Sequence, residues 1–209
     1  MEKNTKMKTT KVVVIAALLM FGLTVWAADY PKMEVAADYS LVHFVPAKLA
    51  NTHNLNGGGG QFTYNFTKFV GLKADFQGYG SQSQTFRLPS GTINTNGNLF
   101  TYLFGPQIKL HGKYAPFVET LFGAAHSNVY SNAFKTNGAA FGNVAPDNNG
   151  FAMLIGGGLD IRIAKTVALR PAEVGYLLTR FGNNINGTNA NQNNFRYSGG
   201  IVFQFGSSE

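Results

Sequence analysis

Cysteine is absent from the 209 residues of the chain, which excludes a disulfide scaffold. Charge is scarce as well, because Asp, Glu, Lys and Arg make up 13% of the chain, against about 25% in typical soluble domains. No apolar run of about 18 residues or more occurs, which excludes a multi-helix membrane protein. The 44% of apolar residues argues against disorder. Glycine and asparagine are abundant instead, with 25 and 21 residues, and the length predicts one domain.

The formal net charge of +7 is concentrated at the start of the chain. Residues 1–27 contain Lys3, Lys6, Lys8 and Lys11 against Glu2, a net +3, which leaves +4 for the rest. A broad excess of cations would indicate nucleic-acid binding, whereas much of this excess belongs to one short segment. We therefore expect no nucleic-acid partner.

The first segment has the order of a secretory signal. The lysines are followed by a mostly apolar stretch from Val12 to Val25 and then by Trp26-Ala27-Ala28, which is the sequence of charged, apolar and small residues that such signals show. The apolar stretch is too short to cross about 30 Å of hydrocarbon comfortably as a helix. We predict a cleaved signal peptide over residues 1–27 and a mature domain over residues 28–209 that leaves the cytoplasm.

The mature segment alternates with a period of two, which indicates β-strands. In Phe195–Phe205 the odd positions hold Phe, Tyr, Gly, Ile, Phe and Phe, whereas the even positions hold Arg, Ser, Gly, Val and Gln. The same alternation predicts strands at Met33–Phe44, Val70–Tyr79 and Phe151–Arg162. Less regular strands are predicted at Gly57–Phe66, Asn98–Ile108, Tyr114–Ala125 and Val167–Phe181. The chain is therefore predicted to be all-β, with eight strands.

The connections between these strands alternate in length. Short connections are predicted at Thr67-Lys68, Lys109–Lys113 and Ala164-Lys165-Thr166. Long connections are predicted at Val45–Asn56, Gly80–Gly97, His126–Gly150 and Gly182–Asn194. Short turns at one end and long loops at the other are typical of an antiparallel up-and-down transmembrane β-barrel, with the turns in the periplasm.

Three prolines interrupt the less regular strands: Pro106, Pro116 and Pro171. A proline in a strand belongs at a bulge or at an unpaired position. Around Pro171 the polar positions change from even, at Arg170, to odd, at Glu173. One inserted residue would produce that change, so we predict a bulge there.

Alternation alone does not say which face points inward. A soluble lipocalin-like barrel has eight strands with its apolar residues inside, and this alternative predicts a periplasmic ligand carrier. Three features favour the inverted arrangement: aromatics too large and numerous for the bore of an eight-stranded barrel, glycines beside charges on the polar face, and the secretory signal. We predict an apolar outer face that contacts lipid.

The mature segment resembles the eight-stranded outer-membrane β-barrels of the OmpA type. The resemblance covers essentially residues 28–209 and is carried by the strand Phe151–Arg162, by Val174–Thr179 and by the terminal Gly200–Phe205. It implies location in the bacterial outer membrane, with outer-membrane lipid and the barrel-assembly machinery as partners. That machinery reads a last strand of alternating aromatics ending in Phe, and four further residues after Phe205 depart from the pattern.

Charged residues of the polar face are predicted to lie inside the barrel and to pair across strands. They are Glu34, Asp38, Lys73, Asp75, Glu119, Asp160, Arg162, Arg170, Glu173 and Arg196. Two interpretations follow: a polar plug that fills the interior, or a gated ion path in which rearranged pairs open a conduit. The plug is favoured, because eight strands leave a bore only wide enough for side chains.

No catalytic residue, cofactor site or metal ligand is predicted. His126-Ser127 is the nearest approach to a hydrolytic pair, but neighbours on a strand point to opposite faces. His43, His53 and His111 are scattered, and no cluster has the spacing of metal ligands. The glycine runs Gly57–Gly60 and Gly156–Gly158 lack the Lys-Ser/Thr ending and the helix of a phosphate loop. They are expected to allow close backbone packing in the barrel wall.

We expect a structural or surface-interaction role for a non-enzymatic outer-membrane barrel, with narrow passive conduction of small solutes as a second role. The extracellular partner is not identified by the sequence. The Asn-rich segment Gly182–Asn194 is a candidate for binding a sugar or a partner, or is simply a hydrophilic loop. The alternatives from other classes are the soluble carrier and, behind it, a lipid-modifying outer-membrane enzyme.

Overall fold

The computed structural model of the chain describes residues 30–44, 53–80, 84–88, 91–95, 97–128, 149–181 and 191–207. These residues form ten β-strands: β1 (Pro31–Phe44), β2 (His53–Asn65), β3 (Val70–Gly80), β4 (Gln84–Leu88), β5 (Gly91–Thr95), β6 (Leu99–Lys109), β7 (Tyr114–Ser127), β8 (Asn149–Ala164), β9 (Val167–Phe181) and β10 (Asn191–Ser207). No described segment forms a helix that is long and apolar enough to cross a membrane. The predicted signal peptide lies outside the described residues.

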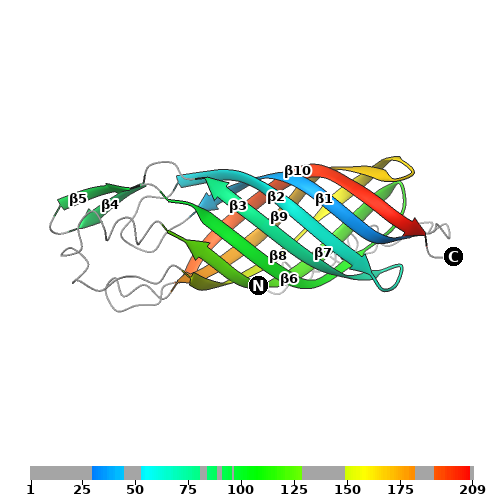
Figure 1. The fold of residues 1–209 in the computed structure, drawn as a ribbon, viewed down its shortest axis with the longest axis horizontal. Helices are drawn as coiled ribbons and strands as arrows, with labels where there is room; N and C mark the ends of the chain where they lie inside the picture. The colour runs from blue at the N-terminus through cyan, green and yellow to red at the C-terminus, as the bar shows by residue number, and fades with distance from the viewer. Residues whose placement is uncertain are drawn as a thin grey trace, which may run out of the picture.

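Eight of the strands close into an antiparallel barrel, and β4 pairs only with β5 (Figure 1). Each barrel strand pairs with its neighbours along the chain, and β1 pairs with β10 from Met33 opposite Phe205 to His43 opposite Phe195. This closure removes the unpaired edges that an open sheet would expose. The structure confirms the predicted eight-stranded, up-and-down barrel.

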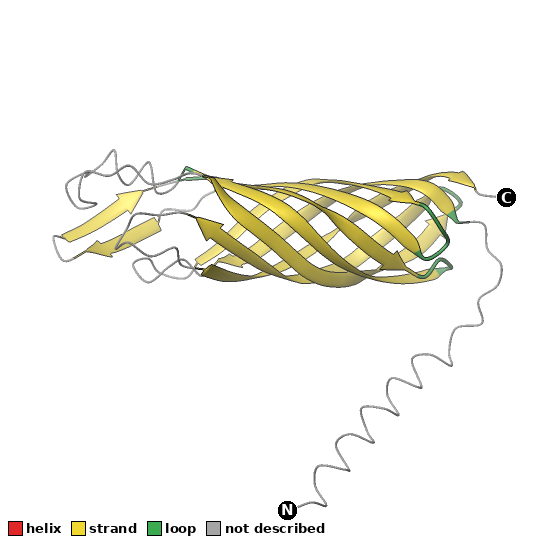
Figure 2. Cartoon of the chain, turned by 90° about the horizontal axis from the view of Figure 1, so that it is seen from below, coloured by secondary structure: helices red, strands yellow, loops and turns green. Residues whose placement is uncertain are grey.

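Three short turns lie together at one end of the barrel, which we call the turn end (Figure 2). They connect β2 to β3, β6 to β7 and β8 to β9, as the sequence predicted. The first turn is closed by a hydrogen bond from Phe66 N to Val70 O of 2.9 Å, and Thr67 Oγ1 accepts one from Val70 N at 3.0 Å. A threonine hydroxyl commonly stabilises a tight turn in this way.

The opposite end, which we call the loop end, carries the β4–β5 hairpin. The hairpin projects beyond the barrel at this end, as Figures 1 and 2 show. It falls within the segment Gly80–Gly97, which the sequence predicted to be a loop without strands. The strands β2 and β10 also begin earlier than predicted, at His53 and Asn191. Residues 182–190 of the Asn-rich segment lie outside the described residues.

The outer and inner faces of the wall alternate residue by residue, most regularly in β6. Large apolar side chains are exposed on the outside, for example Phe104, Ile155 and Phe203 at 42–50%. Most charged and amide side chains in the middle of the strands point inward and are buried, for example Lys73, Gln107 and Glu173. The inverted barrel is therefore confirmed, and the soluble carrier is wrong, because water would meet the apolar face. Barrel strands of 11 to 17 residues are long enough for the roughly 9–11 residues that a tilted membrane strand needs.

The bulge predicted at Pro171 is confirmed. Ser198 of β10 pairs with Glu173 of β9, and Gly200 pairs with Arg170. One residue therefore lies between the two pairs in β10, whereas two residues lie between them in β9. The pairing of β8 with β9 shows the same extra residue. Without this residue, Arg170 and Glu173 would lie on opposite faces of the wall. The bulge therefore brings both side chains into the lumen.

Candidate functional site

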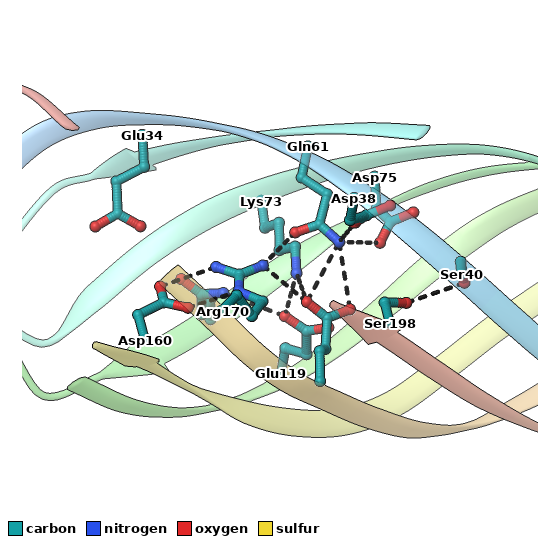
Figure 3. Close-up of polar contacts among 12 residues, drawn as sticks. Glu34, Asp38, Ser40, Gln61, Lys73, Asp75, Glu119, Asp160, Arg170 and Ser198 are labelled. Carbon is teal, nitrogen blue, oxygen red and sulfur yellow. Dashed lines mark hydrogen bonds and ion pairs between the residues drawn. The ribbon is translucent and has the colours of Figure 1, made fainter. Parts of the chain in front are cut away.

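A network of polar side chains fills the middle of the barrel, and Figure 3 shows part of it. Every one of the eight barrel strands contributes to this network. One member from each strand, in chain order, is Glu34, Gln61, Lys73, Lys109, Glu119, Asp160, Glu173 and Arg196. These eight side chains are at most 4% exposed. Because each strand has a partner across the lumen, the network connects strands that are not neighbours in the wall.

Glu173 is the centre of the network. One of its carboxylate oxygens accepts from Lys73 Nζ at 2.9 Å and from Arg170 Nη1 at 2.8 Å. The other accepts from Arg196 Nη2, which also donates to Asp75 Oδ2 at 2.8 Å. Lys73 in turn donates to Glu119 at 2.8 Å. A single buried carboxylate thus meets three cations, each of which keeps a second carboxylate partner.

The network continues toward the turn end through Asp160. Arg170 binds this carboxylate with two nitrogens, Nε at 2.6 Å and Nη2 at 2.9 Å, in the bidentate geometry that makes arginine–carboxylate pairs strong. Lys109 Nζ bridges Asp160 and Glu34 at 2.6 Å each. Glu34 also accepts from Gln204 Nε2 at 3.2 Å.

Acidic groups outnumber basic ones in this interior. Six carboxylates, Glu34, Asp38, Asp75, Glu119, Asp160 and Glu173, stand against the four cations Lys73, Lys109, Arg170 and Arg196, a formal charge of −2. Among the described residues Asp38 has no cation within ion-pair distance and accepts only amide donors, from Gln61 at 2.7 Å and Gln77 at 2.8 Å. The amide groups of Gln61 and Gln77 therefore stabilise the Asp38 carboxylate, which has no cation partner among the described residues.

An aromatic ring, that of Phe117, lies among the cations of the network. Phe117 is 4% exposed, and its ring centroid lies 4.6 Å from Arg170 Cζ, 5.3 Å from Lys73 Nζ and 5.8 Å from Lys109 Nζ. These distances are within the range of cation–π attraction. Gly158 makes room for the ring, because a Cβ there would lie 2.8 Å from Phe117 Cζ.

On the loop side of the network the lumen becomes mostly apolar, although Thr101, Thr179, Gln192 and Asn194 are also buried there. Three hydroxyl groups in contact come first: Ser40 Oγ lies 3.2 Å from Tyr79 Oη and 3.0 Å from Ser198 Oγ. Beyond it lie buried side chains that together we call the apolar layer: Val42, Leu55, Leu99, Leu103, Leu121, Ala125, Leu154, Leu177 and Phe181. All are at most 3% exposed.

The structure places nine of the ten predicted interior charges in the network, and Asp38 among them is only half-buried. The exception is Arg162, which is half-buried at the turn end and makes no ion pair with a described residue. The pairing of β8 with β9 becomes irregular between Arg162 and Ala164, so Arg162 leaves the regular lumen-facing row.

Three informative members of the lumen were among those that sequence reasoning missed. Lys109 was assigned to a turn, but β6 extends to it and its ammonium is buried. Gln61 carries no charge and follows a glycine run, so it did not stand out. Phe117 was not assigned to either face, because the strand Tyr114–Ala125 was read as irregular. Strict alternation within β7 would have placed Phe117 inside the barrel, because it lies two residues from the lumen-facing Glu119 and therefore on the same face.

The candidate hydrolytic pair is not assembled in the described part of the chain. Ser127 is 3% exposed, whereas the preceding His126 shares a hydrogen bond of 2.8 Å with Asn149 Oδ1. His43 similarly contacts Asn54 Oδ1 at 2.8 Å. His111 Nδ1 contacts the carbonyl oxygen of Lys68 at 2.7 Å, in the neighbouring turn. No three His, Asp or Glu side chains of the described ranges converge as metal ligands do.

Comparison with known proteins gives similarity in fold rather than in sequence. No family model matches the chain, and no curated protein matches it in sequence. The neisserial surface protein A is similar in structure with a TM-score of 0.58 at 13% identity, covering 83% of this chain and 97% of that one. The outer membrane protein OprG from Pseudomonas aeruginosa has a TM-score of 0.56 at 12% identity, covering 85% and 97%.

The attachment invasion locus protein Ail of Yersinia pestis is a third such structure. Its TM-score is 0.53 at 12% identity, and the match covers 84% of this chain and 99% of Ail. At these identities the comparison concerns the fold. The chain therefore has the eight-stranded fold of small bacterial outer-membrane barrels, and its apolar outer face fits the bilayer in which that fold is found.

Proposed function

We propose that this protein is a surface-presenting outer-membrane barrel, in which a filled and rigid β-barrel holds extracellular segments at the cell surface. The observation that carries the proposal is the filled lumen: a network from all eight strands, followed by the apolar layer toward the loop end. A structure that connects every strand across the lumen stabilises the wall. It fills the lumen of the described part of the barrel with charged and apolar side chains.

Two further observations support the proposal. The β4–β5 hairpin extends beyond the barrel at the loop end, where a surface partner would meet it (Figure 1). The turns at the other end are only a few residues long, so the chain places its extra length on one side of the membrane. Loops on a rigid scaffold are the usual location of binding functions.

We also infer that the chain is not an enzyme. In the described residues the candidate pair His126 and Ser127 comes from adjacent positions with opposite orientations, and a nucleophile needs its base within hydrogen-bond reach. The buried carboxylates of the lumen are held by cations and amides.

Conductance measurements test the filled lumen. The purified barrel is reconstituted into vesicles, which are then fused with a planar bilayer. Heat-sensitive mobility on SDS gels confirms folding, and co-flotation with the vesicles confirms insertion. We expect no steady single-channel conductance. A stable conductance of the wild-type protein, with a constant value in repeated insertions, would contradict the plug and favour passive conduction.

Cell-surface binding tests the presenting role. Residues 84–95 are replaced by a Gly/Ser linker, which removes the β4–β5 hairpin but leaves all eight barrel strands. Whole cells with either version are applied to an array of glycans and extracellular matrix proteins. We expect wild-type cells to bind at least one class of ligand and the linker variant to lose that binding. Equal binding by cells that lack the protein would refute a surface-interaction role.

A further inference from the structure

The turn end of the barrel carries a ring of cations without acidic partners. Its members are Lys32, Lys68, Lys113, Arg162 and Lys165, and none forms an ion pair with a described residue. The carboxylates of Glu34 and Asp160, each two residues from one of these cations along a strand, are buried and bound to Lys109. Asp29 and Glu209 lie outside the described residues. We call this set the basic rim.

A cavity of about 720 Å³ opens at one side of the basic rim. It lies where the turn between β8 and β9 meets the end of β10, and the two are joined by a hydrogen bond from Gln204 N to Thr166 O of 2.8 Å. Arg162 and Lys165 line the cavity. No carboxylate lines it, so two cations face the space without a counter-charge from the described residues.

Two buried polar atoms at this cavity lack a partner. Arg162 Nε and Gln204 Oε1 make no hydrogen bond with the described residues, although both atoms are buried. Gln204 itself is 5% exposed. An unpaired buried donor costs free energy comparable to a lost hydrogen bond. An anion with its own hydroxyl groups could satisfy the guanidinium donor and the amide acceptor together.

The cavity also has an apolar side. Ile163 and Phe205 line it and are 65% and 49% exposed, in register with the outer face that contacts lipid chains. Because turns of such barrels lie in the periplasm, this opening stands at the level of the lipid head groups of the inner leaflet. Cations beside an apolar wall match a phosphate head group joined to acyl chains.

We propose that this cavity binds the head group of an anionic glycerophospholipid of the inner leaflet. The phosphodiester lies against Arg162 and Lys165, head-group hydroxyls reach Gln204 Oε1, and one acyl chain follows Ile163 and Phe205. The arginine fork suits phosphate geometry. A free phosphate ion has no apolar part to contact Ile163 and Phe205, so we assign the cavity to the lipid. The inference rests on the proposed membrane location but not on the surface-presenting role.

Native mass spectrometry of the full chain in a neutral detergent tests the proposal, because it separates bound lipid from bound phosphate by mass. Phosphatidylglycerol is the probe, with phosphatidylcholine and inorganic phosphate as comparison ligands. We expect one retained phosphatidylglycerol per barrel, and about tenfold less retention in the variant R162Q/K165Q, since it loses charge-assisted hydrogen bonds. The matched control is Arg180→Gln, an exposed cation near the loop end, which should retain the lipid.

Several results would overturn the proposal: full retention by R162Q/K165Q, an equal loss in Arg180→Gln, equal retention of phosphatidylcholine, or binding of inorganic phosphate at the concentration that suffices for the lipid. Lys165 is an exposed turn residue, so Lys165→Gln alone is not expected to prevent folding and should still weaken retention severalfold. Heat-sensitive mobility on SDS gels is measured for every variant. A variant that keeps this mobility but loses the lipid separates failure of the site from failure of the membrane fold.

Discussion

Replacement of Glu173 by Gln should destabilise the barrel more than any other single loss of charge in the lumen. The side chain is 1% exposed and accepts from Lys73, Arg170 and Arg196. Removing one partner of a buried ion pair typically costs about 3–5 kcal/mol, because the other charge is left uncompensated. Each of the three cations keeps another carboxylate, so we expect the lower end, about 3 kcal/mol.

The matched control is Asp38→Asn. Asp38 is half-buried and accepts only from the amides of Gln61 and Gln77, at 2.7 and 2.8 Å. An asparagine oxygen can still accept these hydrogen bonds, and the change removes one of the two surplus negative charges. We expect the free energy of unfolding to stay within about 1 kcal/mol of the wild type.

Urea unfolding in lipid vesicles measures both variants. The single tryptophan, Trp26, belongs to the predicted signal peptide, so far-ultraviolet circular dichroism and the gel-mobility shift replace tryptophan fluorescence. For a slope of about 1–3 kcal/mol per molar urea, Glu173→Gln should lower the midpoint by about 1–3 M. If Glu173→Gln and Asp38→Asn cost the same, the reasoning that charge pairing at Glu173 stabilises the barrel is refuted.

Three further predictions concern the wall. Ile201→Arg on the outer face should destabilise the barrel by about 2–4 kcal/mol in vesicles, and Phe203→Arg, nearer the turn end, by less. A loss of only about 0.5 kcal/mol for Ile201→Arg, as for a surface change in a soluble protein, would contradict lipid contact. Gly158→Ala should cost about 1–3 kcal/mol, because its Cβ would lie 2.5 Å from a carbonyl oxygen of β9, whereas Gly60→Ala, with its nearest atom at 3.6 Å, should be tolerated in the same unfolding assay. The closed barrel should resist SDS until heated, because no edge strand is exposed; identical gel mobility before and after boiling would contradict closure.

Much of the architecture follows from local patterns in the sequence. In the regular strands, a period of two is visible within about six residues. It assigns each side chain of Met33–Phe44 or Phe195–Phe205 to one of two faces. The shift from Arg170 to Glu173 is likewise local, and it correctly predicted the bulge in β9. Connection lengths, read from the same pattern, predicted that turns and loops would lie at opposite ends.

The errors arose where the pattern is weak. The hairpin β4–β5 lies in a segment rich in Ser, Thr, Asn and Gly, whose composition indicates a loop. Phe117 is a large aromatic on the polar face, and it fits inside only because Gly158 leaves space opposite it. Lys109 lies at the end of a strand, where boundaries are uncertain by a few residues.

The sequence by itself therefore determined the class of fold, the two faces of the wall and the candidates for the lumen. Only the tertiary structure decided which charges meet: Glu173 with Lys73 and Arg196, Lys109 with Glu34, and Arg162 with none of the described residues. The physical reason is that alternation along one strand decides whether a side chain points inward or outward, whereas pairing across the lumen depends on the tilt and stagger of all eight strands. Closure of the barrel sets that stagger, and no single segment contains it.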